Sequence, residues 1–153
     1  MKIGQAIATL GPLGYLPYIP GTAASVFGLI ISWCLNNFLP REIVFWVIVF
    51  LIFLGMVSAN IAEKNFKIKD DPRIVIDELA GMLIASYSLK HWIWLILAFG
   101  LFRFLDIKKI LGIKQIQKLP GGLGIVADDL LAAIYTVLII RLLYYGKFIS
   151  VAY

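Results

Sequence analysis

The sequence is organised around one stretch, Asp71-Pro72-Arg73-Ile74-Val75-Ile76-Asp77-Glu78-Leu79-Ala80-Gly81. Adjacent carboxylates stand here at the start of a segment rich in apolar residues. An ionised side chain at the edge of hydrocarbon is costly unless something binds it, which marks it as a candidate functional site. Further acidic residues, Asp106 and the pair Asp128 and Asp129, occupy similar edges. We therefore predict that the chain gathers these carboxylates at one face of a membrane.

The composition is that of an integral membrane protein. Of the 153 residues, 61% are hydrophobic and 15% are charged, whereas soluble domains are about 45–50% apolar and about 25% charged. We predict one membrane-embedded domain over residues 1–153. The net charge of +5 favours an anionic membrane surface over nucleic acid, which requires a basic face on a soluble fold. The single cysteine, Cys34, excludes an intrachain disulfide and a cysteine metal site.

The N-terminal part is predicted to lie outside the hydrocarbon. Residues 2–10 have apolar residues at helical spacing but are too short to span a bilayer, which indicates a surface helix. Residues 11–22 are rich in glycine and proline and are predicted to form a loop. Thr22 or Ser25 can cap the helix that follows, whose start offers backbone N–H groups to an anion. Both a simple turn with a cap and a phosphate-contacting loop fit this pattern.

Long apolar segments predict the spanning helices. Residues 23–39 and 43–61 are charge-free on either side of a short polar turn, so we expect a transmembrane hairpin. Residues 107–118 alternate apolar and basic residues, which is typical of a surface helix on anionic lipid. Residues 121–124 are glycine-rich and predict a flexible turn or a weak phosphate-binding loop. The last span is predicted over residues 130–145, with Asp128 and Asp129 in its first helical turn.

Residues 77–105 are predicted to form two short helices. One continuous span would place Lys90 and His91 near its centre, where a charge costs at least about 2.5–3.5 kcal/mol. It would also separate Asp77 from Asp106 by about 40 Å at 1.5 Å per residue. A hairpin of residues 77–89 and 92–105 avoids both problems and returns Asp106 to the side of Asp77. The predicted fold is thus all-α, a polytopic bundle of membrane helices with a short helical hairpin and an N-terminal surface helix.

The distribution of basic residues predicts the orientation. With this folding, ten of the 14 lysines and arginines fall on the carboxylate side. The positive-inside rule therefore makes the carboxylate face cytoplasmic. The tryptophans fall near the opposite ends of the predicted spans, as expected of an interfacial belt on the other face.

The clustered acids predict a metal site. Five neighbouring carboxylates repel one another, and a hard divalent cation with oxygen ligands, bridging to a substrate phosphate, compensates that repulsion. Gly81, four residues after the first of these acids, would let helices approach closely enough to share a metal. The predicted catalytic and metal-binding residues are Asp77, Glu78, Asp106, Asp128 and Asp129.

Cationic residues near the acids are candidates for binding the substrate. Arg103 precedes Asp106 by three positions on the same helical face. It is interpreted either as a phosphate clamp or as a simple salt-bridge or snorkelling residue. The predicted substrate-binding set is Thr22, Arg73, Arg103 and Lys108.

These blocks together resemble the phosphatidylglycerophosphatase A family of bacterial lipid phosphatases. The resemblance runs in order through Pro20-Gly21-Thr22 with Ser25, residues 71–81, Phe102 to Lys108, and Gly121 to Asp129. It covers nearly the whole chain. Two positions depart from the family's pattern, since Lys109 stands where the family usually has proline and Ala133 lies near a common glycine.

The resemblance implies an all-helical fold and an Mg²⁺-dependent enzyme. Such an enzyme removes the terminal phosphate of phosphatidylglycerophosphate to give phosphatidylglycerol at the cytoplasmic face of the bacterial inner membrane. Its substrate is thus an anionic phospholipid. We expect the acids to hold one or two Mg²⁺ ions that activate a water, or one aspartate to act as nucleophile; Arg103 and Lys108 would stabilise the charge on the phosphoryl group.

Two other classes of membrane protein also bring acidic residues together and are alternatives to the phosphatase. A lipid phosphotransferase of the CDP-alcohol type does so, but the spaced Asp-Gly and Ala-Arg pattern expected of that family is absent from this sequence. A cation or proton transporter uses acids as a relay through the depth of the membrane. Here the acids lie along one side, which favours the phosphatase.

Overall fold

A computed structural model describes residues 2–110 and 112–145, and every regular element in these ranges is helical. This confirms the predicted all-α class. The elements are α1 (Ile3–Ala8), a 3₁₀ turn η1 (Leu13–Tyr15), α2 (Pro20–Phe38), α3 (Arg41–Phe66), α4 (Ile76–Ala85), α5 (Trp92–Lys108), α6 (Ile113–Ile116) and α7 (Gly121–Tyr145).

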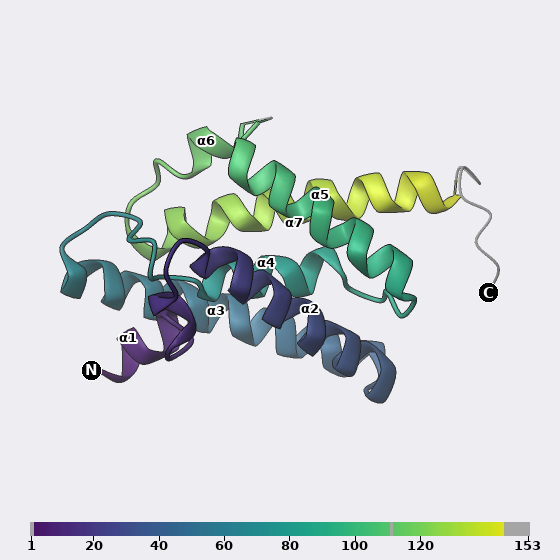
Figure 1. Cartoon of the computed structure of the whole chain (residues 1–153), viewed down its shortest axis with the longest axis horizontal. Coiled ribbons are helices and arrows are strands. Elements are labelled where there is room, and N and C mark those ends of the chain that lie inside the picture. Colours follow the sequence, from purple (N-terminus) through teal and green to yellow (C-terminus); the bar gives the residue numbers. More distant parts are fainter. Residues whose placement is uncertain (1, 111, 146–153) are drawn as a thin grey trace.

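The short helix α4 lies at the centre of the molecule (Figure 1). It packs against α2, α3, α5 and α7, and eight of its ten residues are buried. Around it, α3 and residues Gly121–Tyr144 of α7 are long and apolar enough to cross a membrane. The outer face of α3 is apolar, with Phe53 68% exposed. An apolar face that wide suits a hydrocarbon solvent better than water.

The predicted break within residues 77–105 is confirmed by the separate helices α4 and α5. The turn between them is held by the buried side chain of Asn36 from α2. Its amide nitrogen donates to the carbonyls of Ser86 (3.0 Å) and Leu89 (3.2 Å), and its amide oxygen accepts from the N–H of Ser88 (3.2 Å). Backbone polar groups inside an apolar environment need such partners. The chain therefore reverses here, and the end of α5 returns to the start of α4.

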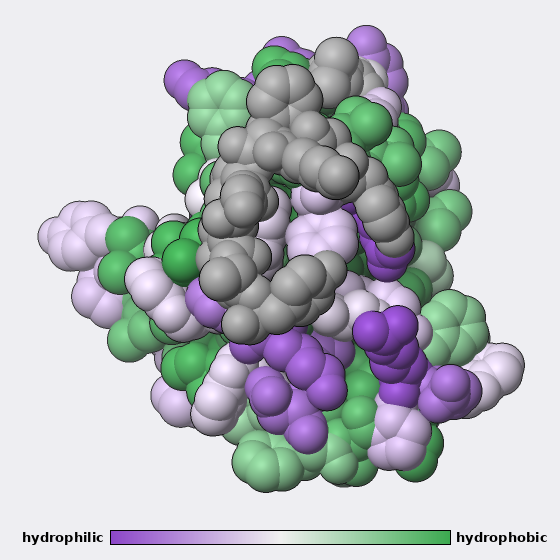
Figure 2. Space-filling view, turned by 90° about the vertical axis from the view of Figure 1, so that its right-hand side faces the viewer, coloured by the Kyte–Doolittle hydropathy of each residue, from purple (hydrophilic) through white to green (hydrophobic). Residues whose placement is uncertain are grey.

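Polar and apolar side chains are mixed at the end of the molecule where α2 ends and α3 and α5 begin. Figure 2 shows this end, with hydrophilic patches set among hydrophobic side chains. Large aromatic side chains are exposed in these elements, among them Phe38 (76%), Trp46 (67%) and Trp92 (62%). Aromatic side chains in such a setting are typical of a membrane interface.

The predicted start of the last helix is wrong, because α7 begins at Gly121 and includes the glycine-rich segment. A Cβ atom added to Gly122 would lie 2.1 Å from the carbonyl oxygen of Met56 in α3. Gly122 thus serves a close approach of two helix backbones, and the glycine-rich segment is helical and forms neither a flexible turn nor a loop. As a result, Asp128 and Asp129 lie in the third turn of α7 and not in its first.

Two other boundaries differ from prediction. Residues 107–118 do not form one surface helix, because α5 continues to Lys108 and only Ile113–Ile116 is helical as α6. Lys109 (φ 45°) and Gly112 (φ 87°) adopt left-handed conformations that interrupt the helix, and the fully buried Ile113 anchors the segment. Near the N-terminus, α2 begins at Pro20 without a side-chain cap, so Thr22 does not cap it. Proline at the first helical position has a preorganised φ.

We expect Gly122→Ala to destabilise the protein by about 1–3 kcal/mol, because the added methyl group meets backbone atoms that cannot move aside. Gly100→Ala is the matched control: Gly100 is an exposed helical glycine with nothing within 4 Å of an added Cβ. Alanine there is neutral or stabilising. Thermal unfolding in detergent measures both variants, and equal melting temperatures would contradict the close packing of α3 and α7.

Candidate active site

All five predicted carboxylates line one cavity of about 270 Å³. The walls come from the loop before α4, the first turn of α4, the end of α5 and the third turn of α7. The lining residues are Asp70, Asp71, Pro72, Ile74, Asp77, Glu78, Asp106, Ile107, Lys109, Asp128 and Asp129. The acidic segments predicted to meet at one face therefore do meet, because α5 runs antiparallel to α4 (Figure 1).

Close helix packing brings α4 and α7 together beneath this cavity. A Cβ atom added to Gly81 would lie 2.6 Å from Cζ of Phe102 and 3.3 Å from Cβ of Asp129. An added side chain would collide with the ring of Phe102 and crowd Asp129, so glycine permits the close approach at this position. The interpretation of Gly81 as a site of close helix approach is thus confirmed.

Three of the carboxylates have buried oxygens without a partner. Oδ1 of Asp77, Oε2 of Glu78 and Oδ2 of Asp129 accept no hydrogen bond from any residue that the structure describes. Ligand oxygens of these three residues all lie within 4.8 Å of one another. Burying polar groups, and above all charges, without partners is costly. Their arrangement fits a divalent cation, which hard oxygen ligands bind.

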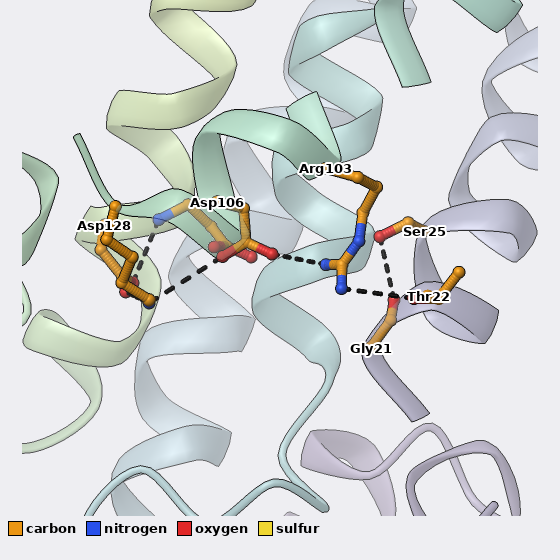
Figure 3. A network of polar contacts seen from close by, with 8 residues as sticks. Gly21, Thr22, Ser25, Arg103, Asp106 and Asp128 are labelled. Carbon is orange, nitrogen blue, oxygen red and sulfur yellow. Dashed lines mark hydrogen bonds and ion pairs between the residues drawn. The ribbon is translucent and has the colours of Figure 1, made fainter. Parts of the chain in front are cut away.

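The other two carboxylates are paired with cationic side chains. Nη1 of Arg103 donates to Oδ2 of Asp106 at 2.5 Å, and Lys109 forms an ion pair with Asp128. The ammonium of Lys109 also lies 3.9 Å from Oδ1 of Asp106. The labelled members of this network, shown in Figure 3, run from Asp128 through Asp106 to Arg103 and the start of α2.

Arg103 connects the acidic cavity to the first turn of α2. Its Nη2 donates to Oγ1 of Thr22 at 3.4 Å, while its Nε is buried without a partner in the described residues. Gly21 lies against the same groups, since a Cβ atom there would stand 2.1 Å from Oε1 of Glu78. The N–H groups of a first helical turn have no intrahelical acceptor. The structure thus brings donors from α2 and α5 close to the carboxylates, although neither Thr22 nor Arg103 is among the residues that line the cavity.

Lys108 and Arg73, also predicted to bind substrate, do not line the cavity. Lys108 is exposed on the outside of α5. Arg73 makes a two-pronged interaction with Asp71, at 2.8 and 2.7 Å, and its guanidinium stacks over the ring of Phe66 at 3.9 Å. These hydrogen bonds hold the pKa of Asp71 below its usual value and that of Arg73 above it. The pair therefore stabilises the loop that leads into α4.

Lys109 is the cationic residue among those that line the cavity, and it is absent from the predicted set. The available signal was its spacing of three residues from Asp106, which places two residues on one helical face. Its left-handed backbone, with φ 45° and ψ 45°, was not foreseeable from a basic run. That conformation ends α5 and directs the next residue away from the helix axis.

The chain matches one protein family and several named proteins along most of its length. The family described as Phosphatidylglycerophosphatase A matches residues 6–144. A protein of Haemophilus influenzae named phosphatidylglycerophosphatase A is 34% identical, with 86% of this chain and 83% of the relative covered. Its Escherichia coli namesake is 33% identical over 79% of this chain and 72% of its own length.

A third relative carries a different name. A Bacteroides thetaiotaomicron protein, provisionally named phosphatidylinositol-3-phosphatase, is 35% identical over 83% of this chain and 84% of its own length. No solved structure matches the chain. The family match spans all the elements that build the acidic cavity, and the chain belongs to the phosphatidylglycerophosphatase A family.

Proposed function

We propose that this protein hydrolyses the terminal phosphomonoester of phosphatidylglycerophosphate to give phosphatidylglycerol and inorganic phosphate. Family membership establishes a phosphatase. The observation that supports the chemistry is the set of unpartnered, buried oxygens on Asp77, Glu78 and Asp129 beside Arg103 and Thr22. Neither a lipid phosphotransferase nor a transporter is favoured by these relatives.

The carboxylates fit a magnesium site. Asp77, Glu78 and Asp129 would hold the ion, since their ligand oxygens converge and lack other partners. When bound, Mg²⁺ supplies neutralisation of phosphate oxygens and a more acidic bound water. Asp106 and Asp128 face the same cavity and complete the acidic wall.

The chain's own cations and donors receive the phosphate. Arg103 is held in place by Asp106 and reaches Thr22, so its guanidinium is oriented before the substrate arrives. Its planar donors match phosphate oxygens, and the first turn of α2 adds N–H groups and a favourable dipole. During the in-line displacement of the alcohol by water, negative charge builds up on the phosphoryl oxygens. Donors that are already fixed in position stabilise that charge.

The proposed location is the bacterial inner membrane, with several passes and the cavity facing the cytoplasm. Support comes from the apolar lengths of α3 and α7 and from the excess of lysine and arginine toward the acidic end. In this arrangement the chain is one membrane-embedded domain. The short helices α4 and α5 are sheltered by α2 and α7, and α1 lies at the surface against α3.

The test is phosphate release by purified protein in detergent micelles. We expect phosphatidylglycerophosphate to be hydrolysed, EDTA to abolish release and added Mg²⁺ to restore it. Glycerol 3-phosphate should react at least about 100-fold more slowly, because it lacks the lipid part whose binding energy assists catalysis. Phosphatidylinositol 3-phosphate tests the activity named for the Bacteroides relative. Faster release from that lipid would reassign the substrate, and release that is insensitive to EDTA would remove the metal.

A further inference from the structure

Seven carboxylates line the cavity. Asp71 is paired with Arg73, and Asp70 accepts a hydrogen bond from Gln117. The five predicted carboxylates fall into two groups according to their partners. Asp77, Glu78 and Asp129 each have a buried oxygen without a hydrogen-bond partner among the described residues. Asp106 and Asp128 are instead engaged by the cationic side chains of Arg103 and Lys109. The cations of the protein therefore neutralise two of these carboxylates, and the charge of the other three is left for a ligand to neutralise.

Lys109 occupies a position between two helices. Its ammonium pairs with Oδ2 of Asp128 on α7 and lies 3.9 Å from Oδ1 of Asp106 on α5. Its side chain is only 26% exposed, so little water competes for the charge. Some phosphatases hold two metal ions in one acidic site, and carboxylates from two elements are suitable ligands for such an ion. Here a side chain provides the positive charge instead.

The number of charges on these side chains supports the same division of the carboxylates into two groups. Apart from Asp70 and Asp71, which have partners of their own, the five predicted carboxylates carry five negative charges when ionised, of which Arg103 and Lys109 balance two. One divalent cation at the unpartnered oxygens leaves a single excess negative charge on these five carboxylates. A second divalent cation between Asp106 and Asp128 would have to displace the ammonium of Lys109 from both carboxylates.

We propose that the ammonium of Lys109 takes the place of a second metal ion, so that this chain binds one divalent cation, at Asp77, Glu78 and Asp129. The inference rests on the proposed function. Lys109 is then a built-in counter-ion that a chelator does not remove. Without its ammonium, Asp106 and Asp128 become a second site for a divalent cation.

The experiment counts Mn²⁺ ions bound to purified, EDTA-stripped protein in detergent, from the electron paramagnetic resonance signal of free Mn²⁺. We expect one bound ion per wild-type chain and two per Lys109→Gly chain. Glycine suits the left-handed backbone at this position (φ 45°), so the variant removes the ammonium without straining the turn. Lys109→Asn, which also tolerates this conformation, is the second variant, and a melting curve confirms that each is folded.

The matched control is Lys67→Gly. Lys67 ends α3 in the same left-handed conformation, with φ 58°, but it is exposed and does not line the cavity. This variant should bind one ion. Two ions in the wild type, or one in folded Lys109→Gly or Lys109→Asn, would overturn the inference and leave the proposed phosphatase intact. No ion in the wild type would instead remove the metal from the proposed function as well.

Discussion

Asp129→Asn should lower kcat for lipid phosphate release by about 1,000-fold or more. Asp129 supplies an unpartnered oxygen from α7 to a group whose other members come from α4. Asparagine keeps the shape of the side chain but removes the charge that a divalent cation requires. Losing one preorganised electrostatic contact at a phosphoryl-transfer site costs about 100- to 1,000-fold, and weaker metal binding adds to that loss.

The same substitution should leave the fold intact or strengthen it. In EDTA, the mutual repulsion of the buried carboxylates opposes folding, so we expect the melting temperature of Asp129→Asn to equal or exceed that of the wild type. Added Mg²⁺ should raise the wild-type melting temperature and leave the variant unchanged. Glu42→Gln, an exposed acid in the first turn of α3, is the control and should behave as the wild type. A variant that keeps a tenth of wild-type activity would contradict this role of Asp129.

Arg103→Lys should lower kcat/KM by about 100-fold, although it conserves the charge. Arg103 reaches Asp106 through one terminal nitrogen and Thr22 through the other. A lysine ammonium cannot span both partners, and it presents no planar pair of donors to a phosphate. The loss should fall mainly on kcat, because the donors act most strongly on the charge of the transition state.

Two comparisons make this result specific to Arg103. Arg41→Lys changes an exposed arginine at the start of α3 and should leave kcat/KM unaltered. Thr22→Val removes only the hydroxyl that Arg103 contacts and should cost less than the arginine substitution. If Arg103→Lys retained full activity, Arg103 would be a structural partner of Asp106 and not a phosphate clamp.

The meeting of the acids was predictable from the sequence because it follows from the cost of charge in hydrocarbon. Lys90 and His91 forced a break, and the break returned Asp106 to Asp77. The sequence did not reveal what holds that break, namely the side chain of Asn36, 50 residues before the carbonyl of Ser86 that it contacts. A buried amide in an apolar helix carries no local signal of its partner.

The errors have a common physical origin in backbone conformation. Gly121 to Gly124 resembled a turn, because glycine weakens isolated helices, yet tertiary packing against Met56 favours a helix there. Lys109 was overlooked in favour of Lys108, because a left-handed residue at the end of α5 cannot be recognised from a pair of lysines. The identity of the acids was thus accessible from sequence, whereas the identity of their cationic partner was not.

The depth of the aspartate pair within α7 has a consequence for how substrate is encountered. Asp128 and Asp129 lie about 10–12 Å along the helix from Gly121, at 1.5 Å per residue. Under the proposed function, the phosphate group of the substrate reaches these aspartates while the glycerol carbons of the same lipid lie beside apolar turns of α7. The lipid can therefore stay in its leaflet during the reaction. Encounter then proceeds by lateral diffusion, and turnover follows the mole fraction of substrate in the bilayer rather than its bulk concentration.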